Sequence, residues 1–179
     1  LNEQGLQRTR RVGKVASLDA ALTAQPLDGS LGIAHTRWAT HGVPNETNAH
    51  PHWSHSSLAV VHNGIIDNFE PIKADLIATG YGFESDTDTE VIAHLIHRNR
   101  QQGMSLTEAV RDAASRCEGA YALGVVDETQ PDLLLAARKG SPLVIGLGSD
   151  ENYIASDQLA LLQVTDQFMF LEDGDIAEI

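Results

Sequence analysis

The stretch Leu58-Ala-Val-Val-His-Asn-Gly64 carries the clearest strand pattern of the chain and sets the frame of the fold. Its first part, Leu58–His62, has the β-branched, apolar composition of a buried strand, and Asn63-Gly64 indicates a turn that ends it. Upstream, Leu31–Ala34 also predicts a buried strand. The polar segment between them, 35–55, has no apolar period, yet it contains five of the eight histidines and both tryptophans. A long loop of this kind in a compact domain indicates a functional role.

Three amphipathic helices are expected after this strand. The first is capped by Asn68 and has Pro71 in its first turn, the second follows Ser85–Glu90, and the third runs from Ser105 to about Cys117. Their expected core positions are Ile72, Leu76 and Ile77, then Val91, Ile92, Leu95 and Ile96, and then Leu106, Ala109, Val110 and Ala113. Nearer the start, Leu6–Val15 is expected as an exposed strand or hairpin arm, followed by a short helix over Ser17–Thr23 capped by Ser17.

The last third of the chain changes to short strands separated by turn residues. The expected strands are Tyr121–Val126, Leu133–Ala137, Leu143–Leu147, Tyr153–Ser156 and Phe168–Leu171. Strands around a block of helices, with no sustained β-α-β alternation, predict one α+β domain over residues 1–179 with mostly antiparallel sheets. Two sheets with helices outside them would bury the strands on both faces.

Composition narrows the functional classes. The chain has 179 residues, 12 basic and 25 acidic side chains, and a net charge of −13. That balance argues against nucleic acid as the main partner, and the basic cluster Arg8, Arg10, Arg11 and Lys14 is interpreted as a solvated strand face. No run approaches the roughly 20 apolar residues of a membrane span. A single cysteine, Cys117, excludes a disulfide framework and suits the cytoplasm, where we expect the protein to act on something small.

The histidines raise the possibility of a metal site. Their spacing fits zinc poorly, because no i, i+4 histidine pair with a carboxylate occurs and no cysteine joins them. His94 and His97 lie three apart on an expected helix, one toward the core and one toward solvent. We therefore expect no metal and no other cofactor. Cys117 lies on the apolar stripe of a helix, which predicts a small buried side chain and not a nucleophile.

Two pairs of residues point to amino-acid chemistry. Arg37, after a buried strand, could hold a carboxylate, and Asp88, just before a helix, could hold an ammonium group. Together they would recognise both charges of an α-amino acid, although each alone is more commonly a solvated charge. Asn63-Gly64 is either an ordinary turn or an oxyanion hole, in which an amide side chain and a glycine N–H stabilise a developing negative oxygen.

Longer motifs resemble one known family. The strings occur in one order at consistent separations and closely resemble the glutaminase domain (glutamine amidotransferase type 2) of glutamine–fructose-6-phosphate aminotransferases, also called glucosamine-6-phosphate synthases. The resemblance covers essentially the whole chain. It rests on His35-Thr-Arg-Trp-Ala-Thr-His-Gly42, Asn48-Ala-His-Pro-His52, Val61-His-Asn-Gly-Ile-Ile-Asp-Asn68, Ser85-Asp-Thr-Asp-Thr-Glu-Val91, Leu134-Leu-Ala-Ala-Arg-Lys-Gly-Ser-Pro-Leu143, Ile154-Ala-Ser-Asp-Gln-Leu-Ala-Leu-Leu162 and Phe170-Leu-Glu-Asp-Gly-Asp-Ile-Ala-Glu-Ile179.

This resemblance implies a four-layer αββα sandwich of the N-terminal-nucleophile hydrolase type. It also implies hydrolysis of L-glutamine to glutamate and ammonia, which a separate sugar-isomerase domain uses to convert fructose 6-phosphate to glucosamine 6-phosphate. The roles it implies are the α-carboxylate site for Arg37, the α-ammonium site for Asp88 and the oxyanion hole for Asn63 and Gly64. It places Trp38, Thr40 and His41 in a loop closing over glutamine, about 37–45, with Trp38 gating the ammonia path and His50 organising the closed pocket.

One departure from the family is decisive for activity. The family's nucleophile is a cysteine at the mature N-terminus that opens a Cys-Gly-Ile segment, whereas this chain opens at Leu1 and has no such segment. We therefore expect a domain without its first strand or strands and without the sugar-isomerase domains, inactive as a glutaminase by itself. Loss of an interior strand would leave an edge open, which predicts a marginal monomer or an edge-to-edge dimer, from a parent that forms homo-oligomers.

Three other interpretations stay open at this point. The chain could be the glutaminase domain of another amidotransferase, such as amidophosphoribosyltransferase, although the Trp-Ala-Thr-His and Asn-Ala-His-Pro-His spellings favour the sugar enzyme. It could be a non-catalytic module that binds or senses an amino acid. Metal-dependent hydrolysis through the histidine loop is the third interpretation.

Overall fold

Two long antiparallel strands form the centre of the fold in a computed structural model that describes residues 1–38 and 40–179. These are β2 (Leu58–Ile66) and β3 (Gly119–Asp127), in register from Leu58 opposite Asp127 to Ile66 opposite Gly119. β1 (His52–Ser54), β4 (Leu134–Lys139) and β8 (Ile176–Glu178) complete a five-stranded sheet of order β1-β2-β3-β4-β8. A second sheet has the order β6-β5-β7, from β5 (Val144–Leu147), β6 (Asn152–Ala155) and β7 (Phe168–Phe170).

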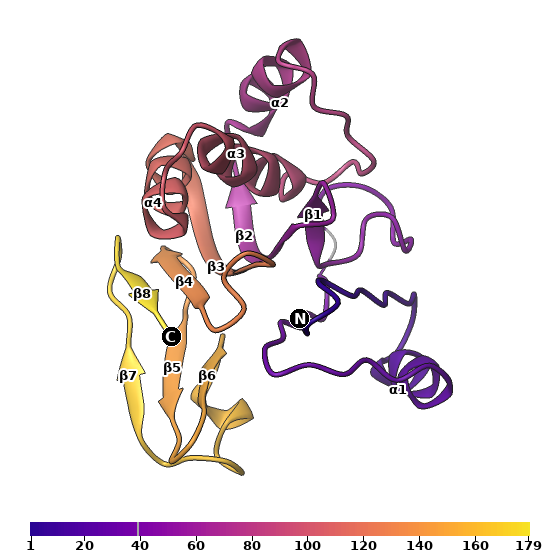
Figure 1. The fold of residues 1–179 in the computed structure, drawn as a ribbon, viewed down its shortest axis with the longest axis vertical. Helices are drawn as coiled ribbons and strands as arrows, with labels where there is room; N and C mark the ends of the chain where they lie inside the picture. The colour runs from indigo at the N-terminus through magenta and orange to yellow at the C-terminus, as the bar shows by residue number, and fades with distance from the viewer. Residues whose placement is uncertain (39) are drawn as a thin grey trace.

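Three helices cover one face of the five-stranded sheet (Figure 1): α2 (Phe69–Ala78), α3 (Glu90–Gln101) and α4 (Leu106–Arg116). The main core lies between them and the sheet, and Val60, Leu123, Val91, Ile92 and Leu95 are buried there. α4 begins with the expected cap, since Ser105 accepts from the N–H of Glu108 and the Glu108 carboxylate accepts from that of Ser105. The three downstream helices are thus confirmed at the predicted places.

The other face of the five-stranded sheet packs against the second sheet. Ala122 and Ala136 of the first sheet form a smaller core with Leu143 and Ile145. β3 is therefore buried on both faces from Tyr121 to Asp127, which explains its continuous apolar run, whereas β2 is buried from Leu58 to His62 and at Ile66 but leaves Gly64 and Ile65 exposed. The described residues contain three layers, helices, sheet and sheet, of the expected four-layer sandwich. None of their helices is long and apolar enough to cross a membrane.

The strand predictions need two corrections in this region. Asn63-Gly64 does not end the strand, because β2 continues through both residues to Ile66. Gly64 adopts a φ of 133° within the strand. A positive φ favours glycine here as it does in a turn, so the composition of Asn63-Gly64 does not distinguish the two. The two shortest strands of the first sheet, β1 and β8, were not expected from the sequence. Each has three residues, too few to show a period.

The N-terminal third departs most from expectation. Residues 6–14 form no strand, and α1 (Val15–Ala24) begins two residues before Ser17, so Ser17 is not its cap. α1 carries no buried residue and lies away from the sheets (Figure 1). Leu31–Ala34 is not a strand either. Leu31 and Ile33 pack half-buried on Ala59 and Val126, but no ladder forms there.

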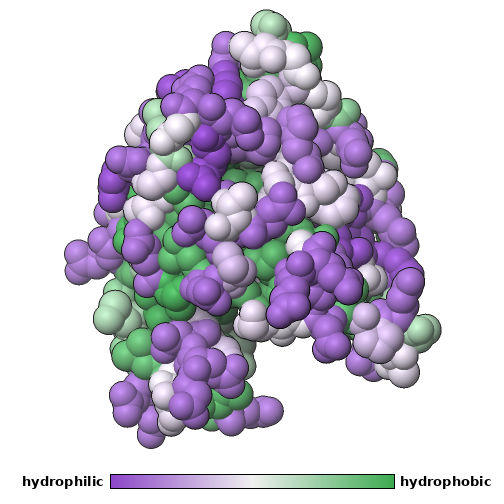
Figure 2. Space-filling model, viewed as in Figure 1, coloured by the Kyte–Doolittle hydropathy of each residue, from purple (hydrophilic) through white to green (hydrophobic). Residues whose placement is uncertain are grey.

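Smaller corrections concern single side chains. Asn68 stands at the start of α2 but does not cap it. Its side chain bridges two backbone groups instead, donating to the carbonyl of Arg116 and accepting from the N–H of Glu118. Ile77 is exposed, whereas Leu76 is buried. Apolar surface gathers around the second sheet in Figure 2, where Leu147, Met169 and Phe170 are exposed.

We expect Gly119→Ala to destabilise the fold strongly. Gly119 has a φ of 106°, and an added Cβ would lie 2.3 Å from the Ile65 carbonyl oxygen. Backbone strain and the clash together should lower the free energy of unfolding by about 3 kcal/mol or more in urea denaturation. Gly82→Ala is the matched control, because an added Cβ there meets nothing within 4 Å. Equal stability of the two variants would contradict this account of the β2–β3 pairing.

Candidate active site

The site starts from the backbone of β2 beyond Val60, where β1 no longer pairs with it. In an antiparallel pair, alternate residues direct their N–H groups away from the partner strand. Asp67 donates to the Glu118 carbonyl, so this alternation turns the N–H groups of His62, Gly64 and Ile66 away from β3. Two of them reach side chains: His62 N–H donates to His50 Nδ1 at 3.3 Å, and Ile66 N–H donates to Asp88 Oδ2 at 2.8 Å. The N–H of Gly64 lies between them.

Only glycine fits at position 64. A Cβ added there would lie 2.0 Å from the Ala120 carbonyl oxygen and 3.0 Å from Ser141 Oγ, and the φ of 133° is unfavourable for other residues. The backbone of β2 therefore lies close against β3 while its opposite side stays open. The N–H of Gly64 is therefore an exposed backbone donor at the edge of a cavity.

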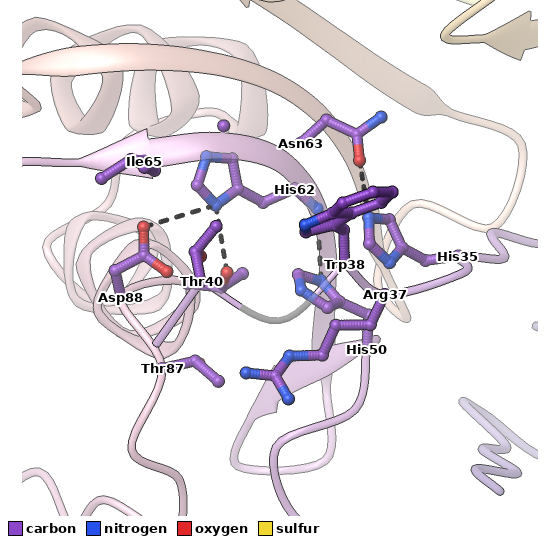
Figure 3. A pocket seen from close by; sticks show the side chains of 12 residues that line it. His35, Arg37, Trp38, Thr40, His50, His62, Asn63, Ile65, Thr87 and Asp88 are labelled. Carbon is purple, nitrogen blue, oxygen red and sulfur yellow. Dashed lines mark hydrogen bonds and ion pairs between the residues drawn. The ribbon is translucent and has the colours of Figure 1, made fainter. Parts of the chain in front are cut away.

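The cavity has a volume of about 270 Å³, near the lower end of small-molecule sites. Figure 3 shows Arg37 and Asp88 entering it from opposite sides of the view, with His35, Asn63 and Trp38 along one wall. Its lining residues are His35, Arg37, Trp38, Thr40, His50, His62, Asn63, Gly64, Ile65, Thr87, Asp88 and Thr89. Of the eight residues predicted from the sequence, the structure brings together seven: Arg37, Trp38, Thr40, His50, Asn63, Gly64 and Asp88.

His41 is the predicted residue that does not line the cavity. Its Nδ1 lies 3.9 Å from Asp88 Oδ1, and its ring contacts the Phe69 ring edge-on at 5.2 Å between centroids. Trp38 is 90% exposed, so its indole stands at the mouth. Ala39, within the predicted closing loop, lies outside the described residues.

In the part of the chain that the structure describes, the hydrogen-bond partners of Arg37 are neutral groups. Its guanidinium donates to the carbonyl oxygens of His41, Gly42 and Val43, the last two at 3.2 and 3.3 Å. These bonds bend the loop back on the arginine, but they leave its positive charge uncompensated. No carboxylate of the described chain forms an ion pair with Arg37.

Asp88 is the opposite charge, and it is 3% exposed. Oδ2 accepts from Ile66 N–H, and the nearest basic atoms are the ring nitrogens of His41 and His62 at 3.9 and 4.0 Å. The turn that carries Asp88 is fixed by Glu90, whose carboxylate accepts from the N–H groups of Glu84 and Ser85. Burial raises the pKa of Glu90, but bonds from His94, Glu84 and Ser85 outweigh it and lower that pKa to about 2.

Buried histidines along this wall are neutral. Burial lowers the pKa of His35, His50 and His62, and it lowers that of His52 to about 4. Nearby histidines and Arg37 lower the pKa of His50 further. A neutral His62 beside Asp88 leaves the negative charge of that carboxylate uncompensated in the cavity. These neutral histidines therefore leave the positive charge of Arg37 and the negative charge of Asp88 in place on the cavity.

Sequence reasoning missed several of the lining residues. His35, His62, Ile65, Thr87 and Thr89 lie inside the quoted motifs, but no spacing signal distinguished them from their neighbours. His62 Nδ1 lies 3.0 Å from Thr89 Oγ1, and His52 Nε2 lies 3.1 Å from Thr87 Oγ1. These contacts join segments 27 and 35 residues apart, which only the tertiary structure brings together.

The basic cluster near the start supports this wall, which corrects its interpretation as a solvated strand face. The Arg8 guanidinium lies 3.5 Å above the Trp53 ring, and Arg10 donates to the carbonyls of Thr47 and Ala49 at 2.9 and 3.0 Å. Burial lowers the pKa of Arg8 to about 10. Both arginines thus hold the loop that contains His50.

A second histidine cluster lies outside the cavity. His94 and His97 are both buried, contrary to the expectation that one faces solvent. His97 stacks on His55 at 4.3 Å between ring centroids, and Ser54 Oγ lies 2.8 Å from His94 Nδ1. Within residues 1–38 and 40–179, no group of three or more His, Cys, Asp or Glu side chains is arranged to hold a metal ion.

Cys117 is the buried side chain that the sequence predicts. It is 3% exposed in the main core, and burial raises the pKa of its thiol to about 12. A thiol with so little thiolate at neutral pH is a poor nucleophile. Cys117 also does not line the cavity.

The fold and this cavity define a glutamine amidotransferase domain, with opposite fixed charges and backbone donors at a strand edge. A glutamine amidotransferase domain family matches residues 35–163, and the chain belongs to that family. Among solved structures, it is similar to glutamine phosphoribosylpyrophosphate amidotransferase from B. subtilis complexed with ADP and GMP. The TM-score is 0.66 at 29% identity, over 81% of this chain and 32% of that one. A structure described as the allosteric regulatory enzyme of purine biosynthesis matches with a TM-score of 0.68 at 31% identity, over the same shares.

More similar relatives come from the curated proteins. Glutamine–fructose-6-phosphate aminotransferase (isomerizing) of Pseudomonas aeruginosa is 62% identical over 99% of this chain. The protein of the same name from Escherichia coli is 60% identical over 99% of it. In both cases the chain spans 29% of the relative's length. The predicted fold class and family are therefore confirmed, and amidophosphoribosyltransferase is the more distant likeness.

We expect acid to destabilise the fold from about pH 6.5 downward. An unfolded histidine has a pKa near 6.5, whereas those of folded His52 and His50 are lower, so unfolding takes up protons below that pH. At pH 5 these two residues should account for about two protons, or roughly 2–3 kcal/mol lost per pH unit. Urea denaturation from pH 7 to 5 measures the slope, and His52→Gln should reduce it by about one proton. A flat profile would contradict neutral burial.

We expect Cys117 to resist alkylation in the folded protein. With a pKa of about 12, roughly one thiol in ten thousand is ionised at pH 8, and the side chain is buried. Mass spectrometry after iodoacetamide treatment should find it unmodified in buffer and modified in urea. Alkylation of the native protein at the rate of an exposed thiol would make Cys117 a candidate nucleophile again.

Proposed function

We propose that this domain binds L-glutamine and serves its hydrolysis to glutamate and ammonia. The observation that carries the proposal is the pair Arg37 and Asp88, two uncompensated opposite charges on one small cavity. A free α-amino acid presents a carboxylate and an ammonium group on one carbon, and it is the ligand that this pair matches. Arg37 would exchange some loop carbonyls for the α-carboxylate, and Asp88 Oδ1 would take the α-ammonium group.

The γ-amide of glutamine would then lie along β2. A nucleophile that attacks its carbonyl carbon leaves a negative charge on the carbonyl oxygen. The N–H of Gly64 and the side-chain NH2 of Asn63 are the donors proposed to stabilise that oxygen. The C–N bond then breaks and ammonia leaves with the proton that the nucleophile gave up, after which water hydrolyses the acyl intermediate and releases glutamate and the free nucleophile. Trp38, Thr40 and His41 belong to the loop proposed to close over glutamine, with Trp38 at the ammonia exit and His50 organising the wall.

The nucleophile is a separate question from binding. Family resemblance implies a cysteine with a free α-amine, whereas the one cysteine present, Cys117, is buried with a raised pKa. We therefore propose that these 179 residues bind glutamine without hydrolysing it at a measurable rate. Binding of an amino acid is then the activity that we propose for the isolated chain.

For the whole protein, we propose the activity of a glutamine–fructose-6-phosphate aminotransferase. The relatives named glutamine–fructose-6-phosphate aminotransferase, at about 60% identity, support that activity over the likeness to glutamine phosphoribosylpyrophosphate amidotransferase at 29%. Ammonia would pass to a sugar-isomerase domain that forms glucosamine 6-phosphate, in the cytoplasm. We also propose that the parent protein is a homo-oligomer and that the isolated chain can dimerise edge to edge, which sedimentation can test.

Calorimetric titration with glutamine tests the binding step. We expect the wild type to bind glutamine. Arg37→Gln or Asp88→Asn should raise the dissociation constant by about 30-fold or more, because each leaves one ligand charge unpaired. The matched controls are Arg111→Gln and Asp19→Asn, the same charge changes at exposed positions. They should bind as wild type does.

Discrimination between ligands sharpens the test. Glutamine methyl ester lacks the carboxylate and should lose the contribution of Arg37, so Arg37→Gln should affect ester binding by less than about threefold. If the wild type does not bind glutamine, the binding proposal is wrong. If the wild type and a Cys117→Ala variant release ammonia from glutamine equally and well above the buffer rate, the proposal that these 179 residues do not hydrolyse it is wrong.

A further inference from the structure

The direction of the Asn63 side-chain amide decides what Asn63 can do. An asparagine amide carries an acceptor oxygen on one side and a donor NH2 on the other. Only the NH2 stabilises a negative oxygen, so an oxyanion hole needs a second group that holds Oδ1 away from the cavity. The structure provides one such contact: His35 Nε2 lies 2.7 Å from Asn63 Oδ1.

Besides this contact with Asn63, His35 is held in place by stacking. Its ring stacks on that of His50 with 4.0 Å between centroids and 27° between planes. His50 is fixed in turn, because its Nδ1 accepts from His62 N–H at 3.3 Å. A backbone N–H can only donate, so His50 Nδ1 carries no proton. The chain of contacts starts and ends on β2, at His62 and at Asn63 (Figure 3).

The proton on His35 and the direction of the Asn63 amide determine each other. With the proton on Nε2, the ring donates to Oδ1 and the NH2 faces the cavity. A doubly protonated ring donates from Nε2 as well. Only a neutral ring with its proton on Nδ1 would turn the amide around, and among the described residues that buried nitrogen has no partner within hydrogen-bonding distance.

We infer that His35 is a positioning residue that turns the Asn63 NH2 toward the glutamine cavity by donating from Nε2 to Oδ1. This inference rests on the proposed function for its catalytic consequence, but the hydrogen bond itself does not depend on glutamine. It assigns His35 a role that differs from ligand binding. His35 would act on the developing oxyanion through Asn63 and leave ground-state binding of glutamine nearly unchanged.

Two variants separate the hydrogen bond from the packing. His35→Phe keeps a ring to stack on His50 but has no donor. His35→Gln loses the ring but keeps an NH2 that can donate to Asn63 Oδ1. A merely structural role predicts that Phe substitutes better, whereas the positioning role predicts that Gln does. His55→Asn, at a histidine outside the cavity with a φ of 51°, serves as the control.

The first measurement is NMR of the 179-residue chain at pH 7. Long-range ¹H–¹⁵N spectra should show a protonated Nε2 and an unprotonated Nδ1 for His35. The Asn63 side-chain NH2 resonances should move in His35→Phe and return toward their wild-type positions in His35→Gln. A neutral Nδ1–H form in the wild type, or NH2 shifts equal in the two variants, would overturn the inference.

The second measurement is glutaminase kinetics of the full-length gene product. His35→Phe should lower kcat by about 100-fold, the loss typical of one oxyanion-hole donor, with KM for glutamine changed by less than about threefold. His35→Gln should recover at least about tenfold of that loss. A change mainly in KM, or no recovery with Gln, would overturn the inference. Failure of wild type to bind glutamine would overturn the proposed function instead and leave the NMR result to decide this one.

Discussion

The unpaired side of β2 beyond Val60 is the constraint on which the site depends. A backbone N–H near the protein interior must find an acceptor, and β1 is too short to supply one past Val60. His62 and Ile66 find acceptors in His50 and Asp88, which draws the histidine loop and the turn before α3 to the same strand. Gly64, between them, keeps its N–H at the cavity. The cavity walls are thus organised by backbone groups of one strand.

Charge separation is the second organising feature. Asp88 is buried, and a cation beside it would neutralise the group that the proposed ammonium must meet. The neighbouring His62 does not do so, because burial lowers its pKa and leaves it neutral. Arg37 is surrounded by carbonyl oxygens, which hold the guanidinium without cancelling its charge. Neutral partners on both sides thus preserve two opposite charges for a ligand.

The need for neutral partners also accounts for the high histidine content of the loop. A neutral imidazole can donate from one nitrogen, accept at the other and stack, all without adding charge to the site. His50 uses its acceptor toward β2 and its ring face toward His35. The arginines nearest the start of the chain stabilise this loop from outside, through the Trp53 ring and the carbonyls of Thr47 and Ala49. Arg8 and Arg10 thus lie outside the cavity lining, in which Arg37 is the basic residue.

Most of the elements could be predicted where their pattern is local. α3 and α4 are long enough for Val91, Ile92 and Leu95, or Leu106 and Val110, to show a helical period, and both were confirmed. Two segments were predicted wrongly because their local signal was overridden by the tertiary structure. Leu31–Ala34 has strand composition, but a strand requires a partner at hydrogen-bonding distance. Asn63-Gly64 has turn composition, but the pairing with β3 keeps it extended.

The sequence by itself determined the family, the α+β class and seven of the residues that line the cavity, because linked motifs and helical periods survive in one dimension. It also determined that Cys117 is a core side chain. Only the tertiary structure decided that β2 runs through Asn63 and Gly64, that Asp88 accepts from Ile66, and that His35 meets Asn63. Those contacts join residues 22 and 28 positions apart, and their geometry depends on strand pairing and burial that no local pattern encodes.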